Sequence, residues 1–300
     1  MSKAARAPHA ADAAAQARTL RALLAVAGAA AAWGLWSLFS RPAGLPAATA
    51  GAIVFVVMGL TTLPGALRAP AVTWDRRTVL LLAGNSALDA ANLFAFFAAL
   101  QHTTVAIAVL THYLAPVLVA VLAPWIDRRR TPGAIPAALV AIGGLTLVLE
   151  PWHGERGALI GGALGAASAF AYAGNVFVVR RLSTAVGAYR AISYHSFGAA
   201  ALMAPFALAG GGDLSAGGLA LLALGAIVLG AYAGLAFVWG VTQIASATAA
   251  MLTYLEPLVA GAVGALVWHE PMGEHAALGA ALVLASGIYT ARAGARAAAR

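Results

Sequence analysis

The sequence predicts an all-α integral membrane protein with ten transmembrane helices, arranged as two inverted repeats of five helices. The composition, the spacing of the apolar segments and an internal repeat support this fold class. Hydrophobic residues make up 62% of the 300-residue chain and charged residues only 9%, whereas soluble domains carry about 25% charged residues. The apolar segments are long and continuous, which is typical of spanning helices rather than of barrel strands.

Ten apolar segments have about the length that crosses a bilayer core, which is about 20 residues. They cover residues 20–40, 46–67, 78–100, 104–125, 132–149, 157–179, 188–209, 217–239, 244–268 and 274–293. Residues 1–19 are polar, Ala-rich and without an apolar core, so we expect a cytoplasmic tail there and no secretory signal. Residues 294–300 are expected to form a second short tail.

The basic residues predict the orientation. With the N-terminus inside and ten spans, 16 of the 18 Lys and Arg residues fall on the inner side, and only Arg41 and Arg156 on the outer side. The positive-inside rule therefore predicts an inner (plasma) membrane protein with both termini in the cytoplasm. These arginines face anionic lipid, so the net charge of +8 does not require a nucleic-acid partner.

An internal repeat divides the chain into halves at 20–150 and 151–293. LTHYLAPVL (110–118) aligns with MLTYLEPLV (251–259), which matches Tyr113 with Tyr254 and Pro116 with Pro257. PAALVAIGG (136–144) aligns with GAALVLASG (279–287). Because each half has an odd number of helices, the second half is inverted in the membrane, as in secondary transporters. Channels and membrane enzymes also arise by duplication.

The segments YLEP (254–257), WHE (268–270) and GAAL (279–282) resemble motifs of the drug/metabolite transporter superfamily, in its EamA-type ten-helix branch. The resemblance covers about residues 20–293. It implies a carrier of small organic solutes, since members export amino acids, move nucleobases or take up other metabolites. The first half departs from the pattern: Ala115 occupies the position equivalent to Glu256, and Asp127 lies near where a glutamate would end the fourth helix.

Asp89 and Glu256 are the two acidic residues inside predicted spans, where a charge costs roughly 2.5–3.5 kcal/mol on insertion scales. Asn85, Asp89 and Asn92 are spaced four and three residues apart, so they share one helix face that must point away from lipid. We expect this face to line a substrate cavity. An interhelical hydrogen-bond clamp is the alternative.

Glu256 lies near the middle of its span, beside Pro257. A carboxyl group at this depth can bind a substrate ammonium group or carry a proton across the transport cycle. It can instead have a structural role, satisfying backbone N–H groups of a broken helix. Pro116 and Pro257 are predicted to be hinge or packing positions common to both halves.

Further substrate-binding candidates lie at similar depths. His112 either titrates near neutral pH or stays neutral and hydrogen-bonded. Tyr172 and Asn175 share a face of the sixth span. The predicted substrate-binding set is therefore Trp36, Asn85, Asp89, Asn92, His112, Tyr113, Tyr172, Asn175 and Glu256.

The chain has no phosphate-binding Gly-x-x-x-x-Gly-Lys loop and no HExxH motif, so we expect no cofactor, no metal and no enzymatic activity. The sequence predicts a secondary transporter that exports amino acids or related metabolites by alternating access. An organic-cation or drug exporter and a metabolite uptake carrier are the alternatives among transporters. An intramembrane enzyme or lipid-handling protein is an alternative of a different class. Expected partners are a small-molecule solute and membrane lipid, with protons and a second copy of the chain as further candidates.

Overall fold

The computed structural model describes residues 6–103, 105–128, 131–150, 152, 158–210, 215–269 and 273–298. These residues form α1 (Arg6–Trp33), α2 (Ser37–Ala43), α3 (Ala47–Arg68), α4 (Arg76–His102), α5 (Val105–His112), α6 (Ala115–Ile126), α7 (Ala134–Leu149), α8 (Ala158–Val186), α9 (Ala188–Gly210), α10 (Ala216–Gly225), a π-helical segment (Ala226–Tyr232), α11 (Ala233–Gln243), α12 (Ser246–Leu252), α13 (Leu255–Val267) and α14 (Ala276–Ala298).

The protein is an all-α membrane protein, as predicted. Within the described ranges, nine segments are long and apolar enough to cross a membrane, and a tenth apolar helix at Ala134–Val148 is shorter. The fifth predicted span, 132–149, is therefore correct in place but too long. Gly133 has a left-handed φ of 71° before α7, and Glu150 has one of 42° after it. These turns limit α7 to 16 residues, or about 24 Å of helix.

Four predicted spans are not continuous helices. The first is interrupted between α1 and α2, the fourth between α5 and α6, the ninth between α12 and α13, and the eighth contains the π-helical segment. The fourth and ninth breaks have a common cause, because a proline ring clashes with the carbonyl four residues before it. For Pro116 that residue is His112, the last of α5, and for Pro257 it is Thr253, just after α12.

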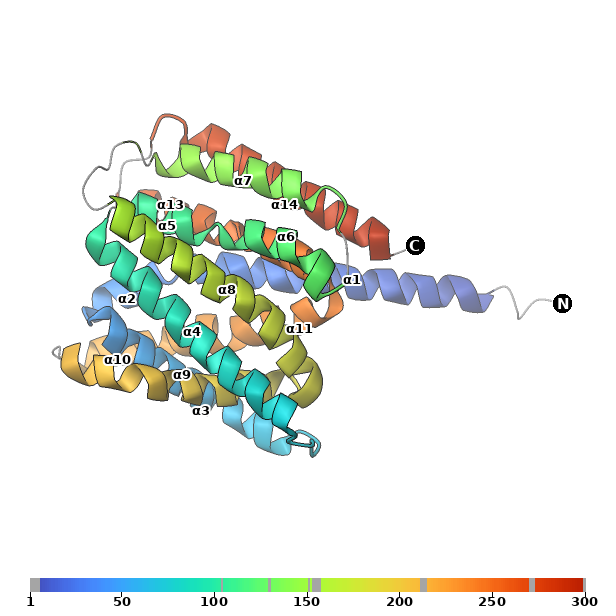
Figure 1. The fold of residues 1–300 in the computed structure, drawn as a ribbon, viewed down its shortest axis with the longest axis horizontal. Coiled ribbons are helices and arrows are strands. Elements are labelled where there is room, and N and C mark those ends of the chain that lie inside the picture. Colours follow the sequence, from blue (N-terminus) through green and yellow to red (C-terminus); the bar gives the residue numbers. More distant parts are fainter. Residues whose placement is uncertain are drawn as a thin grey trace.

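The described residues of both predicted tails are helical. The helix α1 begins at Arg6 rather than near residue 20, and α14 extends to Ala298. Alanine-rich sequence has the highest intrinsic helix propensity, which accounts for both extensions. The outer turns of α1 and α14 lie at the same end of the bundle, where the links after α3 and α6 also lie (Figure 1).

Helices that are equivalent in the two halves pack against one another. The second helix of each half forms the pair α3 and α9, and the fifth forms the pair α7 and α14. The α7–α14 pair lies along one side of the bundle and α3, α9 and α10 along the opposite side, with α6, α8 and α13 between them (Figure 1). This arrangement is the pseudo-twofold packing that inverted repeats produce.

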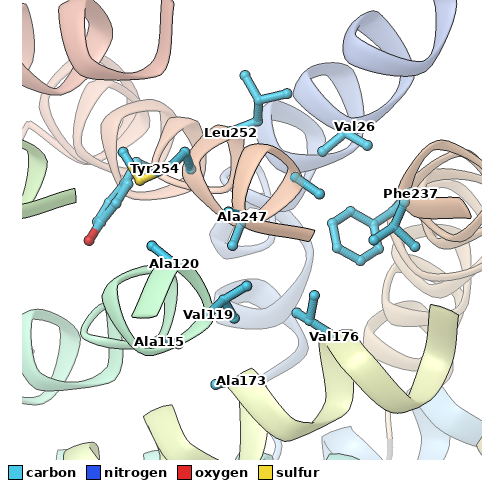
Figure 2. Packing of buried hydrophobic residues seen from close by; sticks show 14 of the residues in the cluster. Val26, Ala115, Val119, Ala120, Ala173, Val176, Phe237, Ala247, Leu252 and Tyr254 are labelled. Atoms are coloured by element: carbon cyan, nitrogen blue, oxygen red, sulfur yellow. The ribbon is translucent and has the colours of Figure 1, made fainter. Parts of the chain in front are cut away.

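Small side chains fill the core between the halves. Ala115, Val119, Val176 and Ala247 are at most 2% exposed. Figure 2 shows the alanine and valine side chains of α6 and α8 facing α12 and Phe237 of α11. Because small residues let helix backbones approach closely in lipid, this core brings the broken fourth and ninth spans together.

The α7–α14 crossing yields a stability prediction. A Cβ atom at Gly144 would overlap the carbonyl oxygen of Gly279, whereas one at Gly143 would meet nothing within 4 Å. We expect Gly144→Ala to destabilise the protein by about 1–3 kcal/mol through overpacking. The matched variant Gly143→Ala is expected to leave thermal stability unchanged or slightly raised, since alanine favours helix. Equal melting midpoints for the two variants in detergent would contradict this packing.

Candidate functional site

The two helix breaks meet at equivalent tyrosines of the repeat. The Tyr254 hydroxyl donates a hydrogen bond of 3.0 Å to the backbone carbonyl of Tyr113. The two ring centroids are 5.9 Å apart. Tyr113 and Tyr254 are 5% and 1% exposed, so this contact lies deep between the halves.

Glu256 follows the second break. It lies in the first turn of α13, and its carboxyl group lies beside the Tyr113 hydroxyl. It also lies within electrostatic range of the Tyr172 hydroxyl. The equivalent turn of α6 contains Ala115 and no acidic residue. The helix breaks therefore carry an acidic residue in one half only.

Two polar stripes with the same spacing face each other across α4 and α8. Asn85, Asp89 and Asn92 on α4 are spaced four and three apart, as are Ser168, Tyr172 and Asn175 on α8. The Ser168 hydroxyl donates to Asn92 Oδ1 at 2.8 Å, and Asn175 Nδ2 donates to Asp89 Oδ1 at 2.7 Å. The pairs run in antiparallel order. We call these hydrogen-bonded faces, with Asp89 and Asn92 on α4 and Ser168, Tyr172 and Asn175 on α8, the ladder between the halves.

His112 connects this ladder to the first helix break. Its Nδ1 atom is 2.7 Å from the Ser168 hydroxyl. Since that hydroxyl donates its only proton to Asn92, the histidine Nδ1–H is the donor in this arrangement. The imidazole also packs against Phe96, Tyr113 and Tyr172, with centroid distances of 4.8, 5.1 and 5.6 Å. His112 is thus a hydrogen-bonded group in an aromatic cluster.

Asp89 has a second partner that no motif indicates. His195 Nε2, from α9, is 2.7 Å from Asp89 Oδ2, and His195 Nδ1 is 2.8 Å from the Ala191 carbonyl. Ser168 and His195 are the site residues absent from the predicted set. The spacing of Ser168 from Tyr172 and Asn175 is a usable sequence signal, whereas the pairing of His195 with Asp89 follows only from the packing of α4 on α9.

Several buried polar atoms have no hydrogen-bond partner among the described residues. They are both amide atoms of Asn85, Asn175 Oδ1, the Tyr172 hydroxyl and Ser196 Oγ, together with Thr103 Oγ1 at the end of α4. An unpaired buried polar atom costs about 1–3 kcal/mol, so such atoms are suited to bind water or a solute. Tyr172 and Asn175 lie in the ladder, while Asn85 lies one turn away from the contacts that Asp89 makes.

Trp36 belongs to the first span. It lies in the turn between α1 and α2, and its backbone carbonyl accepts from Ser40 Oγ at 3.0 Å. Trp33 points inward instead: its Nε1 donates to the Leu229 carbonyl at 2.9 Å, and its ring lies 5.0 Å from that of Phe237.

One end of the bundle, called the arginine-rich end below, carries Arg77, Arg128, Arg180 and Arg181. An ionic cluster joins the halves there. Asp127, at the end of α6, accepts from Arg180 at 3.1 Å and lies 3.5 Å from Arg181, both on α8. The Ser246 hydroxyl, at the start of α12, donates to the same carboxylate. Arg181 also donates to the Ile126 carbonyl at 2.7 Å. The Asp127 side chain is 5% exposed, and those of Arg180 and Arg181 are 13% and 31% exposed, so the ion pair is partly buried.

At the opposite end of the bundle, a hydrogen bond, a cation–π contact and a His–Glu contact link neighbouring helices. Trp268 Nε1 donates to the Ser37 hydroxyl at 3.1 Å, and the Arg41 guanidinium lies 5.1 Å from the Trp268 ring centroid. His275 Nδ1 is 3.5 Å from Glu150 Oε1, across the α7–α14 pair. Glu270 of the WHE segment and Arg129 lie outside the described residues.

Two shallow cavities open at the arginine-rich end. One of about 550 Å³ is lined by residues of the ionic cluster and by the start of α4, including Asp75. The other, of about 510 Å³, lies along Arg76, Leu80 and Val178. Asp75 caps α4, and the hydrogen bond from the Thr78 backbone N–H lowers the pKa of its carboxyl group. None of the predicted substrate-binding residues lines either cavity.

Two inverted halves that meet at paired broken helices, with acidic residues inside the spans, are the architecture of a secondary transporter. Comparison with known families agrees: a model of the EamA-like transporter family matches residues 20–150 and 159–291. The chain therefore belongs to the EamA-like transporter family, with two EamA domains, within the drug/metabolite transporter superfamily. This is a family of transporters and not of enzymes, so the intramembrane-enzyme alternative is set aside.

A solved structure described as "Crystal structure of protein" has the same fold. It superposes with a TM-score of 0.74 at 20% sequence identity, over 89% of this chain and 96% of that one. At this identity the likeness concerns the fold alone. No match is found among curated proteins.

Proposed function

We propose that this protein is a secondary transporter that exports amino acids or related metabolites by alternating access, with the solute bound where the two helix breaks meet. The observation that carries the proposal is the contact between Tyr113 and Tyr254 beside Glu256. Discontinuous helices at the interface of inverted repeats are where secondary transporters bind their solutes.

The asymmetry of the two breaks favours a zwitterion. The first turn of α13 contains Glu256, whose carboxylate suits an ammonium group. The first turn of α6 contains no acidic residue, and a helix N-terminus stabilises negative charge by about 0.3–1 kcal/mol. An amino acid presents both groups, whereas an organic cation would use only Glu256. Organic-cation export is the alternative that the experiment below tests, and uptake is a second alternative.

The remaining candidates have supporting roles in this proposal. Tyr113, Tyr172 and His112 form an aromatic wall of the proposed solute site. The hydrogen bonds of Asn92 and Asn175 in the ladder fix the position of this wall. The Tyr172 hydroxyl, which lies near Thr253 and Glu256, is suited to hydrogen-bond the solute. Pro116 and Pro257 serve as hinges because they lie in the first turn of the second segment of each broken span.

A binding screen followed by counterflow tests the proposed function. Purified protein is heated with standard amino acids, related metabolites and organic cations, since a ligand at 100 times its Kd stabilises the folded state by about 2.7 kcal/mol. Vesicles containing the protein are then loaded with unlabelled ligand and given labelled ligand outside. We expect transient accumulation of labelled amino acids. Accumulation of organic cations alone would contradict the amino-acid assignment.

We propose that the protein lies in the inner (plasma) membrane with both termini in the cytoplasm. The chain has no cysteine, so a single introduced thiol reports on orientation. Thr184, which is exposed at the arginine-rich end, is a suitable position. We expect Thr184→Cys to react with a membrane-impermeant maleimide in inverted vesicles and not in intact cells. The reverse pattern would overturn the proposed orientation.

A further inference from the structure

The pair formed by Asp89 and His195 has a chemistry that solute binding does not explain. Both ring nitrogens of His195 are in hydrogen-bond contact, Nδ1 with the Ala191 carbonyl and Nε2 with Asp89. The other carboxylate oxygen accepts from Asn175. The His195 and Asp89 side chains are 4% and 20% exposed. Every polar atom of the pair is therefore engaged.

Counting protons shows what the pair contains. A carbonyl oxygen only accepts, so His195 Nδ1 must carry a proton to bond to Ala191. A neutral imidazole then has a lone pair on Nε2, which would face the lone pairs of an ionised carboxylate. The 2.7 Å contact therefore requires a second proton between Nε2 and Oδ2. The pair has no net charge whether that proton is placed on the nitrogen or on the oxygen. Removing the proton leaves one negative charge and no hydrogen bond between the two side chains.

Three neighbouring helices supply the groups that surround the pair. On α8, Asn175 donates to Asp89, and the Tyr172 hydroxyl lies within electrostatic range of it. On α3, Phe55 presents its ring to His195 with centroids 6.4 Å apart. Arg190, on α9, donates to the Ala69 and Pro70 carbonyls at the start of the 69–75 link instead. Among the described groups, His195 is thus the basic side chain in contact with Asp89.

We propose that Asp89 and His195 bind the proton whose movement is coupled to solute transport. The inference rests on the proposed transport function and adds a coupling ion to it. Asp89 belongs to α4 in the first half and His195 to α9 in the second, so the proton closes a contact between the halves. One proton binds to the anionic pair from water on one side and leaves to water on the other, and no other bond changes.

The coupling proton is separate from the solute site. Glu256 lies at the helix breaks beside Tyr113, while the Asp89–His195 pair lies on the α9 side of α4. Tyr172 is within electrostatic range of both acidic residues. It therefore provides a short route by which solute binding at the breaks can influence release of the proton.

Solute accumulation driven by a pH gradient tests the proposal. Vesicles containing the full-length protein are given a mixture of radiolabelled L-amino acids and a pH difference of about one unit, which sustains about a tenfold concentration ratio if one proton moves per solute. We expect about tenfold accumulation by the wild type. His195→Gln and Asp89→Asn are expected to give a ratio near one. The matched controls Asp75→Asn and His102→Gln, at the two ends of α4, should keep the tenfold ratio.

The outcomes separate the two proposals. Counterflow by the wild type without gradient-driven accumulation overturns the coupling and leaves the transport function standing. Absence of counterflow as well overturns both. Tenfold accumulation retained by His195→Gln overturns the assignment of the proton to this pair. Counterflow measured on the same vesicles shows that each variant is folded, and Asp89→Asn provides the second variant if one of them fails.

Discussion

Glu256→Gln is expected to raise the solute concentration needed for half-maximal counterflow by about 10- to 100-fold. Glutamine keeps the size of the side chain but cannot offer a charge to an ammonium group. A hydrogen bond to a charged group is worth about 1.5–3 kcal/mol, and each 1.4 kcal/mol is tenfold in affinity. Rates of counterflow over a range of amino-acid concentrations give this value directly.

The same variant separates binding from a structural role. If Glu256 serves mainly to satisfy the broken helix, the substitution should lower the melting midpoint and leave the solute dependence unchanged. If it binds solute, the midpoint without ligand should be preserved and the stabilisation by amino acids lost. Glu274→Gln is the matched control, since Glu274 is exposed in the link before α14. An unchanged concentration dependence in Glu256→Gln would remove Glu256 from the site.

Asp127→Ala is expected to be the most destabilising substitution at the arginine-rich end. Removing one partner of a fully buried ion pair costs about 3–5 kcal/mol, because the other charge remains without compensation. We expect a smaller loss here, because Arg180 and Arg181 are 13% and 31% exposed and solvent screens their charge. Arg180 would be left beside Ser246, which is fully buried. Since Asp127 lies in the first half and both arginines in the second, the loss should also open this end of the bundle.

Thiol labelling measures that opening. Thr248 on α12 is 1% exposed and contacts Thr131 at 3.5 Å. We expect a cysteine placed at Thr248 to react at least about tenfold faster in the Asp127→Ala background, which corresponds to about 1.4 kcal/mol of closure. The double substitution Asp127→Ala with Arg180→Ala should recover part of the stability, since neither charge is then buried alone. Unchanged labelling would mean that the ionic cluster does not hold this end closed.

The sequence predicted the architecture well because its signals are long and repeated. Ten apolar segments and a duplicated Tyr-Leu-x-Pro segment carry enough information to define the spans and their inversion. The breaks were harder to predict: both prolines were assigned as hinges, yet the spans containing them were drawn as continuous. The clash of a proline ring with the carbonyl four residues earlier was a usable signal in the sequence.

The partners of the polar residues could not be predicted to the same extent. A spacing of four and three places Asn85, Asp89 and Asn92 on one face, but it does not say which helix covers that face. Asp89 faces both α8 and α9, so its pairing with Asn175 and with His195 depends on how three helices from two halves pack. Asn85 shows the limit of such spacing: it shares the face of Asp89, yet its amide atoms have no hydrogen-bond partner among the described residues.

The central claim is that solute binds where the two helix breaks meet, and solute protection of introduced thiols tests it most directly. Leu114 and Leu255 occupy equivalent positions of the repeat at the two breaks, and both are half-buried. In the naturally cysteine-free chain, we predict that saturating amino acid slows maleimide labelling of Leu114→Cys and of Leu255→Cys by at least about tenfold, as expected when a bound ligand occupies the site. Labelling of Thr184→Cys at the arginine-rich end should not change. Equal labelling with and without amino acid at both breaks would contradict the claim.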